Sequence, residues 1–112
     1  SGSTGKPKGV QITHQNLVHS TWSRILYYSE PVTNFLLISP FAFDSSVAGI
    51  FWTLCQGGVL SLSREICHLE LQQIVEIITQ HQISHLLCLP SFYKLILEYA
   101  IKQQLVSLRT VI

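Results

Sequence analysis

Residues 34–40 read Asn34-Phe35-Leu36-Leu37-Ile38-Ser39-Pro40, a short apolar run that ends at a proline. A run of this kind is typical of a strand that is buried on both faces of a parallel sheet. The same pattern returns in residues 85–90, His85-Leu86-Leu87-Cys88-Leu89-Pro90. The two runs therefore predict two buried strands, and the carboxyl end of each is marked by its proline.

Helical patterns surround these runs. Four helices are expected: His14 to about Tyr27 with Thr13 as cap, Ser46 to Leu54, Glu70 to Gln82, and one that begins at Ser91. Their buried faces are expected to hold Leu17, Thr21, Ile25 and Tyr28 in the first, Leu71, Ile74, Ile77 and Ile78 in the third, and Leu95, Ile96, Tyr99 and Ala100 in the fourth. Further short strands are expected at Val59 to Leu62 and at Thr110 to Ile112. Strands that alternate with helices predict an α/β fold with a mainly parallel sheet.

The composition limits the classes of protein that fit. The chain has 112 residues, of which 47% are hydrophobic and 12% charged, and its net charge is +1. The charged share is about half of what is usual, which indicates segments that are buried on several sides. A net charge so close to zero gives no reason to expect a nucleic acid or an anionic membrane as partner. The apolar runs are also shorter than the ~18 residues that a membrane helix needs.

The cysteines and histidines do not form a recognisable metal site. Cys55, Cys67 and Cys88 are odd in number and widely spaced, without a C-x-x-C pair, and no histidine stands at metal-ligand spacing. The three cysteines are predicted to be buried, reduced thiols of a cytoplasmic protein.

The first ten residues, Ser1-Gly2-Ser3-Thr4-Gly5-Lys6-Pro7-Lys8-Gly9-Val10, differ most from an ordinary domain. They hold three glycines, three hydroxyl side chains and two lysines, which suit a loop that binds phosphate. A flexible Gly/Ser linker is the alternative. The spacing fits neither the Walker A loop nor the dinucleotide-binding pattern.

Asp44 is the only aspartate in the chain, and it follows the first buried strand. Ligands of open parallel sheets bind beyond the carboxyl ends of the strands, where Asp44 and Cys88 are both expected. A carboxylate in apolar surroundings needs a cation or several hydrogen-bond donors. Two interpretations remain open: Asp44 caps the following helix, or it binds an ammonium group that arrives with a substrate.

Two motifs resemble one known family. Residues 1–9 are similar to the S-G-[ST]-T-G-x-P-K-G signature of the adenylate-forming superfamily, and Phe43-Asp44-Ser45-Ser46-Val47 resembles the F-D-x-S-V motif of amino-acid adenylation domains in non-ribosomal peptide synthetases. The resemblance implies that residues 1–112 are an internal piece of one adenylation domain, within its large N-terminal subdomain. In that piece, residues 1–10 form the phosphate loop and residues 41–48 the amino-acid-binding motif. The family's adenine-binding, ribose-binding, metal-binding and C-terminal lysine elements are expected after Ile112.

The resemblance also implies roles for individual residues. The ATP phosphates are expected to contact Ser1, Gly2, Ser3, Thr4, Gly5 and Lys8, and Lys8 is expected to offset charge on the leaving pyrophosphate during catalysis. Asp44 is expected to bind the substrate's α-ammonium group. Ser45, Ala48 and Cys88 are expected to line the pocket for the amino-acid side chain, with ordinary core packing as the alternative for all three.

The chemistry implied by the resemblance needs ATP and Mg²⁺, with metal ligands outside this chain. An amino acid and ATP would give aminoacyl-AMP and pyrophosphate, and the aminoacyl group would pass to the phosphopantetheine thiol of a partner carrier protein within a peptide synthetase. Two alternatives stay open: an acyl- or aryl-acid CoA ligase of the same superfamily, and a nucleotide-binding module without catalytic activity.

Overall fold

Four parallel strands form the centre of the fold. The computed structural model describes residue 5, residues 9–62 and residues 70–112. The strands are β1 (Asn34–Leu37), β2 (Val59–Leu62), β3 (His85–Leu86) and β4 (Thr110–Val111), and they form one sheet in the order β2-β1-β3-β4. Each neighbouring pair is parallel, with Phe35 opposite both Leu60 and His85. The predicted α/β fold with a parallel sheet is confirmed.

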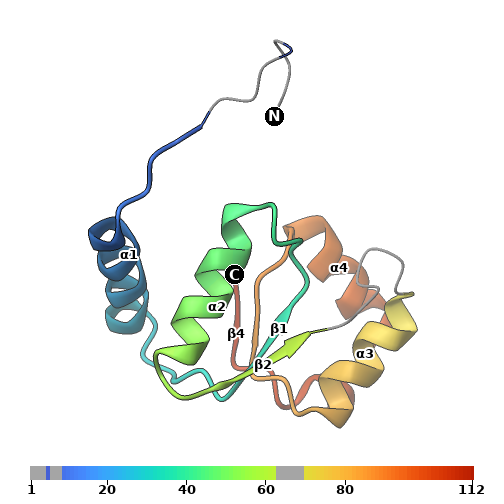
Figure 1. Ribbon diagram of the computed structural model, residues 1–112. Helices are drawn as coiled ribbons and strands as arrows, with labels where there is room; N and C mark the ends of the chain where they lie inside the picture. The colour runs from blue at the N-terminus through green and yellow to red at the C-terminus, as the bar shows by residue number, and fades with distance from the viewer. Residues whose placement is uncertain (1–4, 6–8, 63–69) are drawn as a thin grey trace.

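Helices cover both faces of this sheet. They are α1 (His14–Tyr27), α2 (Asp44–Leu54), α3 (Leu71–Gln80), α4 (Pro90–Tyr99) and the short 3₁₀ helix η2 (Lys102–Leu105). Figure 1 shows α1 and α2 on one side of the strands and α3 and α4 on the other. Because the strands are parallel, β1 and β3 end at the same edge of the sheet. The segments that follow these two strands, which carry Asp44 and Cys88, therefore begin at that edge.

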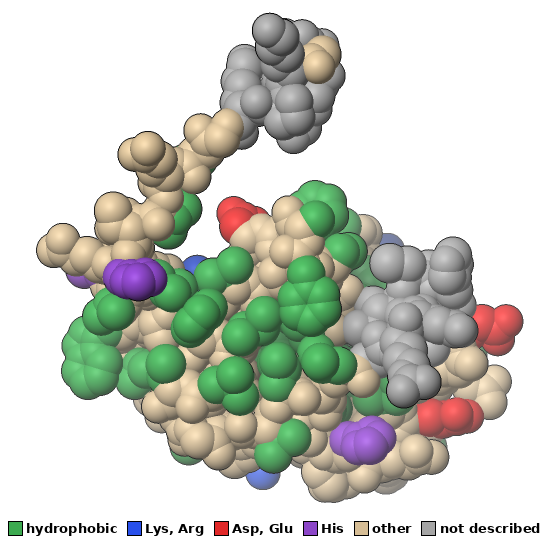
Figure 2. All heavy atoms as spheres, viewed as in Figure 1, with side chains coloured by type: hydrophobic (Ala, Val, Ile, Leu, Met, Phe, Trp, Pro, Cys, Tyr) green, Lys and Arg blue, Asp and Glu red, His purple; other side chains and the backbone are tan. Residues whose placement is uncertain are grey.

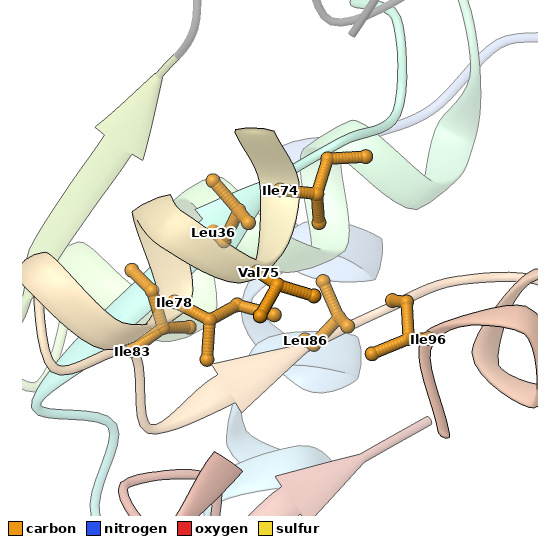
Figure 3. Packing of buried hydrophobic residues seen from close by; sticks show 7 residues of the cluster. All are labelled: Leu36, Ile74, Val75, Ile78, Ile83, Leu86 and Ile96. Carbon is orange, nitrogen blue, oxygen red and sulfur yellow. The ribbon is translucent and has the colours of Figure 1, made fainter. Parts of the chain in front are cut away.

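Each face of the sheet has its own hydrophobic core. The cluster toward α3 and α4 is shown in Figure 3 and consists of Leu36, Ile74, Val75, Ile78, Ile83, Leu86 and Ile96. The cluster toward α1 and α2 consists of Val32, Phe35, Leu37 and Trp52. Phe35 and Leu37 belong to one core and Leu36 to the other, because successive side chains of a strand point to opposite faces. Burial on both faces explains why residues 35–37 are continuously apolar.

Helix α1 begins and ends where the sequence predicts. The Thr13 hydroxyl accepts a hydrogen bond from the Asn16 amide at 3.2 Å, and the Asn16 side chain accepts one from the Thr13 amide at 3.0 Å. This reciprocal pair satisfies two of the amide groups that a helix start leaves without partners. The expected inner residues Leu17, Thr21 and Ile25 are buried or half-buried.

Helix α4 is the element in which the predicted buried face is partly wrong. Leu95 and Tyr99 are 46% and 50% exposed, and Ile96 is the fully buried residue of this helix. Phe92 and Tyr93 pack against the core in their place. The helix carries large apolar side chains on most of its circumference, so helical spacing alone does not select the face that packs.

The cysteines also differ from their prediction. Cys55 is exposed, because it follows the last turn of α2 and leads into the tight turn at Gln56 and Gly57. Cys88 is half-buried, and Cys67 lies outside the described residues. Across the described part of the chain, no helix is long and apolar enough to cross a membrane.

Candidate functional site

A cavity of about 520 Å³ lies between α1 and α2, on one face of the sheet. Its volume falls within the range of small-molecule pockets. The walls and floor come from both helices and from residues in or next to β1, β3 and β4, and they include Leu17, Ser20, Thr21, Arg24, Tyr28, Phe35, Asp44, Ser45, Val47, Ala48, Gly49, Trp52, Leu87 and Ile112. The lining is mainly apolar, and hydrophobic side chains also gather on the visible surface over this part of the molecule (Figure 2).

Asp44 is the first residue of α2 and lines this cavity. The residue in the cap position is Phe43, and no side chain caps the helix, so the interpretation of Asp44 as the helix cap is wrong. The Asp44 side chain is exposed and forms no hydrogen bond with another described residue. The partial positive charge of the helix start favours a carboxylate here. The carboxylate remains free to accept hydrogen bonds from a ligand.

Ser45 and Ala48 line the same cavity as Asp44. Residues at positions i, i+1 and i+4 lie on neighbouring parts of a helix surface, so one turn of α2 presents all three. Both residues are half-buried. The structure therefore brings three of the four expected substrate-binding residues together.

Cys88 is not among the residues that line this cavity; Leu87 is. Cys88 packs against the core on the α3 and α4 side. Side chains alternate in an extended segment, so His85 and Leu87 face α1 and α2, whereas Leu86 and Cys88 face the other way. Burial raises the pKa of the Cys88 thiol, and the Tyr93 backbone acts in the opposite direction. The role of Cys88 in substrate binding remains a prediction from the sequence resemblance.

Most of the expected phosphate loop lies outside the described residues: Ser1, Gly2, Ser3, Thr4 and Lys8. Gly5 is described. Its φ of +79° lies in the left-handed region that favours glycine, and no atom of another described residue lies within 4 Å of the position a β-carbon would take. Space beside the backbone would allow a ligand to approach the chain closely at this position.

Helix α1 contributes residues that the sequence analysis did not assign to a site. Ser20 and Arg24 line the cavity, and the Arg24 guanidinium donates to the Ser20 carbonyl and to its hydroxyl. Ile112 lines the cavity as well. Side chains alternate between the two faces of the sheet along residues 85–88, and this alternation could have identified Leu87 as a residue of the cavity. No sequence pattern indicates that α1 lies beside α2.

The full length of the chain, residues 1–112, matches the family described as AMP-binding enzyme. The chain belongs to this family. Among its relatives, it is 40% identical over 112 residues to bacitracin synthase 3 of Bacillus licheniformis and 33% identical to gramicidin S synthase 2 of Brevibacillus brevis. These alignments cover 99% of this chain but 2% of each relative. The chain thus spans a small part of the length of the proteins it matches.

Solved structures show the same fold as this chain. The non-ribosomal peptide synthetase FmoA3 superimposes with a TM-score of 0.83 at 22% identity, over 95% of this chain and 12% of that one. O-succinylbenzoate coenzyme A synthetase from Bacillus subtilis, in complex with AMP, superimposes with a TM-score of 0.80 at 24% identity, over 99% of this chain and 28% of that one.

The floor of the cavity rests on a buried aromatic group. Trp52 contacts three rings, with centroid distances of 5.0 Å to Tyr28, 6.3 Å to Phe35 and 5.1 Å to His85. His85 is fully buried, and its Nδ1 atom lies 2.9 Å from the Ser84 hydroxyl. Burial lowers the pKa of His85, while the backbone and the charge of Glu30 act in the opposite direction. His85 is therefore held neutral beneath the cavity.

Acidification should destabilise the folded protein through His85. Below the ordinary histidine pKa of 6.5, the unfolded chain binds a proton that the folded chain does not. Above this pH, the imidazole is mostly neutral in both states, so His85 does not change the free energy of unfolding. Below it, stability decreases by at most about 1.4 kcal/mol per pH unit, until the lowered folded-state pKa is reached. Thermal unfolding between pH 7.5 and 5.5 measures this effect, with a His85→Gln variant as control. An equal pH dependence in both proteins would contradict the assignment to His85.

Proposed function

We propose that this chain is part of an amino-acid-activating adenylation domain of a non-ribosomal peptide synthetase. In this proposal the parent enzyme joins an amino acid to ATP to form aminoacyl-AMP and pyrophosphate. Membership in the AMP-binding family supports the use of a nucleotide. The similarity to two peptide antibiotic synthases supports the choice of an amino acid.

The free carboxylate of Asp44 at the mouth of an apolar cavity is the observation that carries the proposal. A cation that leaves water for such a cavity needs an anionic partner, whereas a fatty or aromatic acid brings no positive charge for Asp44 to meet. The α-ammonium group of an amino acid fits this requirement. The side chain of the amino acid would extend past Ser45 and Ala48, where small residues leave room.

The reaction requires the substrate carboxylate and the ATP phosphates to meet beside Asp44. A carboxylate oxygen of the amino acid attacks the α-phosphorus, a new P–O bond forms, and the bond to the pyrophosphate oxygen breaks. We assign the phosphate contacts to residues 1–5 and Lys8, whose hydroxyl, amide and ammonium groups would neutralise charge on the leaving pyrophosphate. Fixing both reactants in one geometry would supply much of the rate enhancement.

Mg²⁺ is expected to shield the phosphate charges in this reaction. The described residues contain no group of three or more His, Cys, Asp or Glu side chains that could hold a metal ion. We assign its ligands to parts of the parent protein outside this chain.

The proposal also assigns partners to the parent protein. The aminoacyl group would pass from AMP to the phosphopantetheine thiol of a peptidyl carrier protein, alongside neighbouring synthetase domains. The relatives support this assignment, because they are synthases of peptide antibiotics. The proposed location is the cytoplasm, where ATP is available.

ATP–pyrophosphate exchange tests the proposal. The complete domain of the parent protein is incubated with each of the twenty amino acids, and the return of labelled pyrophosphate into ATP is measured. We expect exchange that depends on one amino acid or on a few related ones. Exchange with fatty or aromatic acids alone would favour an acid CoA ligase. ATP binding without exchange would favour a non-catalytic nucleotide-binding module.

A further inference from the structure

A buried hydroxyl group helps to hold the loop between β1 and α2, together with a backbone hydrogen bond from the Phe43 amide to the Pro40 carbonyl at 3.0 Å. Ser46 is 1% exposed, and its Oγ atom donates a hydrogen bond to the Phe43 carbonyl at 2.6 Å. The Phe41 carbonyl lies 3.3 Å from the same atom. The Ser46 amide also donates to the Phe43 carbonyl, at 3.0 Å. Ser46 therefore binds the carbonyl group that directly precedes Asp44.

The peptide unit between Phe43 and Asp44 sets the direction in which the Asp44 side chain leaves the backbone. Rotation of this unit changes the φ angle of Asp44 and moves its β-carbon. The Asp44 side chain forms no hydrogen bond with another described residue, so no described residue fixes its far end. The placement of its carboxylate thus depends on the backbone, and that backbone is held by Ser46.

We propose that Ser46 is a positioning residue, which orients Asp44 toward the ammonium group of the substrate through its hydrogen bond to the Phe43 carbonyl. This inference rests on the proposed function. Ser46 itself does not touch the substrate, because it is not among the residues that line the cavity.

A general role in helix stability is the competing explanation, and α2 contains a matched control. Thr53 is fully buried, and its Oγ1 atom donates to the Gly49 carbonyl at 2.6 Å. The bond has the same type and length as that of Ser46. Thr53 itself is nine residues after Asp44, which is about 13.5 Å farther along the helix at a rise of 1.5 Å per residue. Thr53→Val therefore removes an equivalent bond without changing the peptide unit before Asp44.

The test uses the complete adenylation domain and the amino acid that gives the fastest exchange. We expect Ser46→Ala to raise KM for this amino acid about tenfold and to leave KM for ATP unchanged, because one hydrogen bond contributes on this scale. Ser46→Cys, which keeps a weak donor, should give an intermediate KM. Thr53→Val should lower the melting temperature and leave both KM values unchanged.

A substrate without the ammonium group shows whether Ser46→Ala changes the position of Asp44 or disturbs the whole binding site. The desamino analogue of the same amino acid makes no contact that depends on Asp44, so Ser46→Ala should not change its KM. Equal effects of Ser46→Ala on both substrates, or equal effects of Ser46→Ala and Thr53→Val on the amino-acid KM, would overturn the inference. So would an amino-acid KM that Ser46→Ala leaves unchanged.

The failure of this inference can be told apart from that of the proposed function. If no amino acid supports exchange by the unmodified domain, the proposed function itself fails. If Asp44→Asn leaves the amino-acid KM unchanged, Asp44 does not bind the ammonium group and the role of Ser46 fails with it. If Asp44→Asn raises this KM and Ser46→Ala does not, then only the role of Ser46 is wrong.

Discussion

Replacing Asp44 with asparagine in the complete adenylation domain should lower kcat/KM for amino-acid-dependent exchange about 100-fold or more. Asparagine has nearly the same shape as aspartate and keeps one oxygen acceptor, but it removes the negative charge. The substrate ammonium would then enter a largely apolar cavity without an anionic partner. Removing one partner of a desolvated charge pair costs about 2–5 kcal/mol, and the middle of this range corresponds to a few hundred-fold.

The loss should appear in binding of the amino acid and not in stability. Asp44 forms no hydrogen bond with another described residue, so its replacement removes little beyond a favourable interaction with the helix start, about 0.3–1 kcal/mol. KM for ATP and the melting temperature should stay close to those of the unmodified domain.

Glu98→Gln is a matched control for Asp44→Asn. It makes the same carboxylate-to-amide change on α4, across the sheet from the cavity, where Glu98 lies 3.7 Å from Lys94 in an exposed ion pair. Exchange by this variant should be unchanged. If Asp44→Asn retains the amino-acid KM of the unmodified domain, Asp44 does not bind the ammonium group. Unchanged activation of an acid that lacks an ammonium group would point instead to an acid ligase.

The architecture could be predicted from the sequence wherever a local pattern has one structural solution. Helix α1 is such a case, because Thr13 and Asn16 can satisfy the helix start reciprocally. Strand β1 is another, because a run as apolar as residues 35–37 must be covered on both faces. The start of α2 was misplaced by two residues. One of the two interpretations of Asp44 made it the cap of this helix, but the cap residue is Phe43, and the Ser46 hydroxyl donates to the Phe43 carbonyl from inside the helix.

Only the residues of the site that lie within one turn of α2 could be predicted from the sequence. Asp44, Ser45 and Ala48 share a surface because of helix geometry, which spacing reveals. The contribution of α1 depends on the packing of two helices that are separated by a strand. No local pattern encodes that packing, so Ser20 and Arg24 were not found.

Gly58→Ala should be the most destabilising small substitution near α2 and β2. A β-carbon at this position would lie 2.2 Å from the Val32 carbonyl oxygen and 3.1 Å from the Thr53 methyl group. The oxygen belongs to the backbone just before β1, where Val32 is 2% exposed, so it cannot turn aside as a side chain can. The Gly58 amide also donates to the Thr53 carbonyl at 3.0 Å, which holds residue 58 in place from the other side.

Relief of this overlap requires β2 to move relative to the segment that leads into β1. That movement would weaken the hydrogen bond from the Val59 amide to the Thr33 carbonyl, which is 2.9 Å long. Overpacking of a buried site costs about 1–3 kcal/mol, and a rigid backbone neighbour places Gly58→Ala at the upper end of this range. Urea denaturation of the complete domain measures the change. Gly9→Ala is the control, because a β-carbon at Gly9 meets no atom within 4 Å and its backbone does not adopt a positive φ. Since alanine also restricts the unfolded chain, the control should be neutral or slightly more stable than the unmodified domain. Equal stability of the two variants would mean that β2 can shift without cost, and that the contact between Gly58 and Val32 does not fix the edge of the sheet.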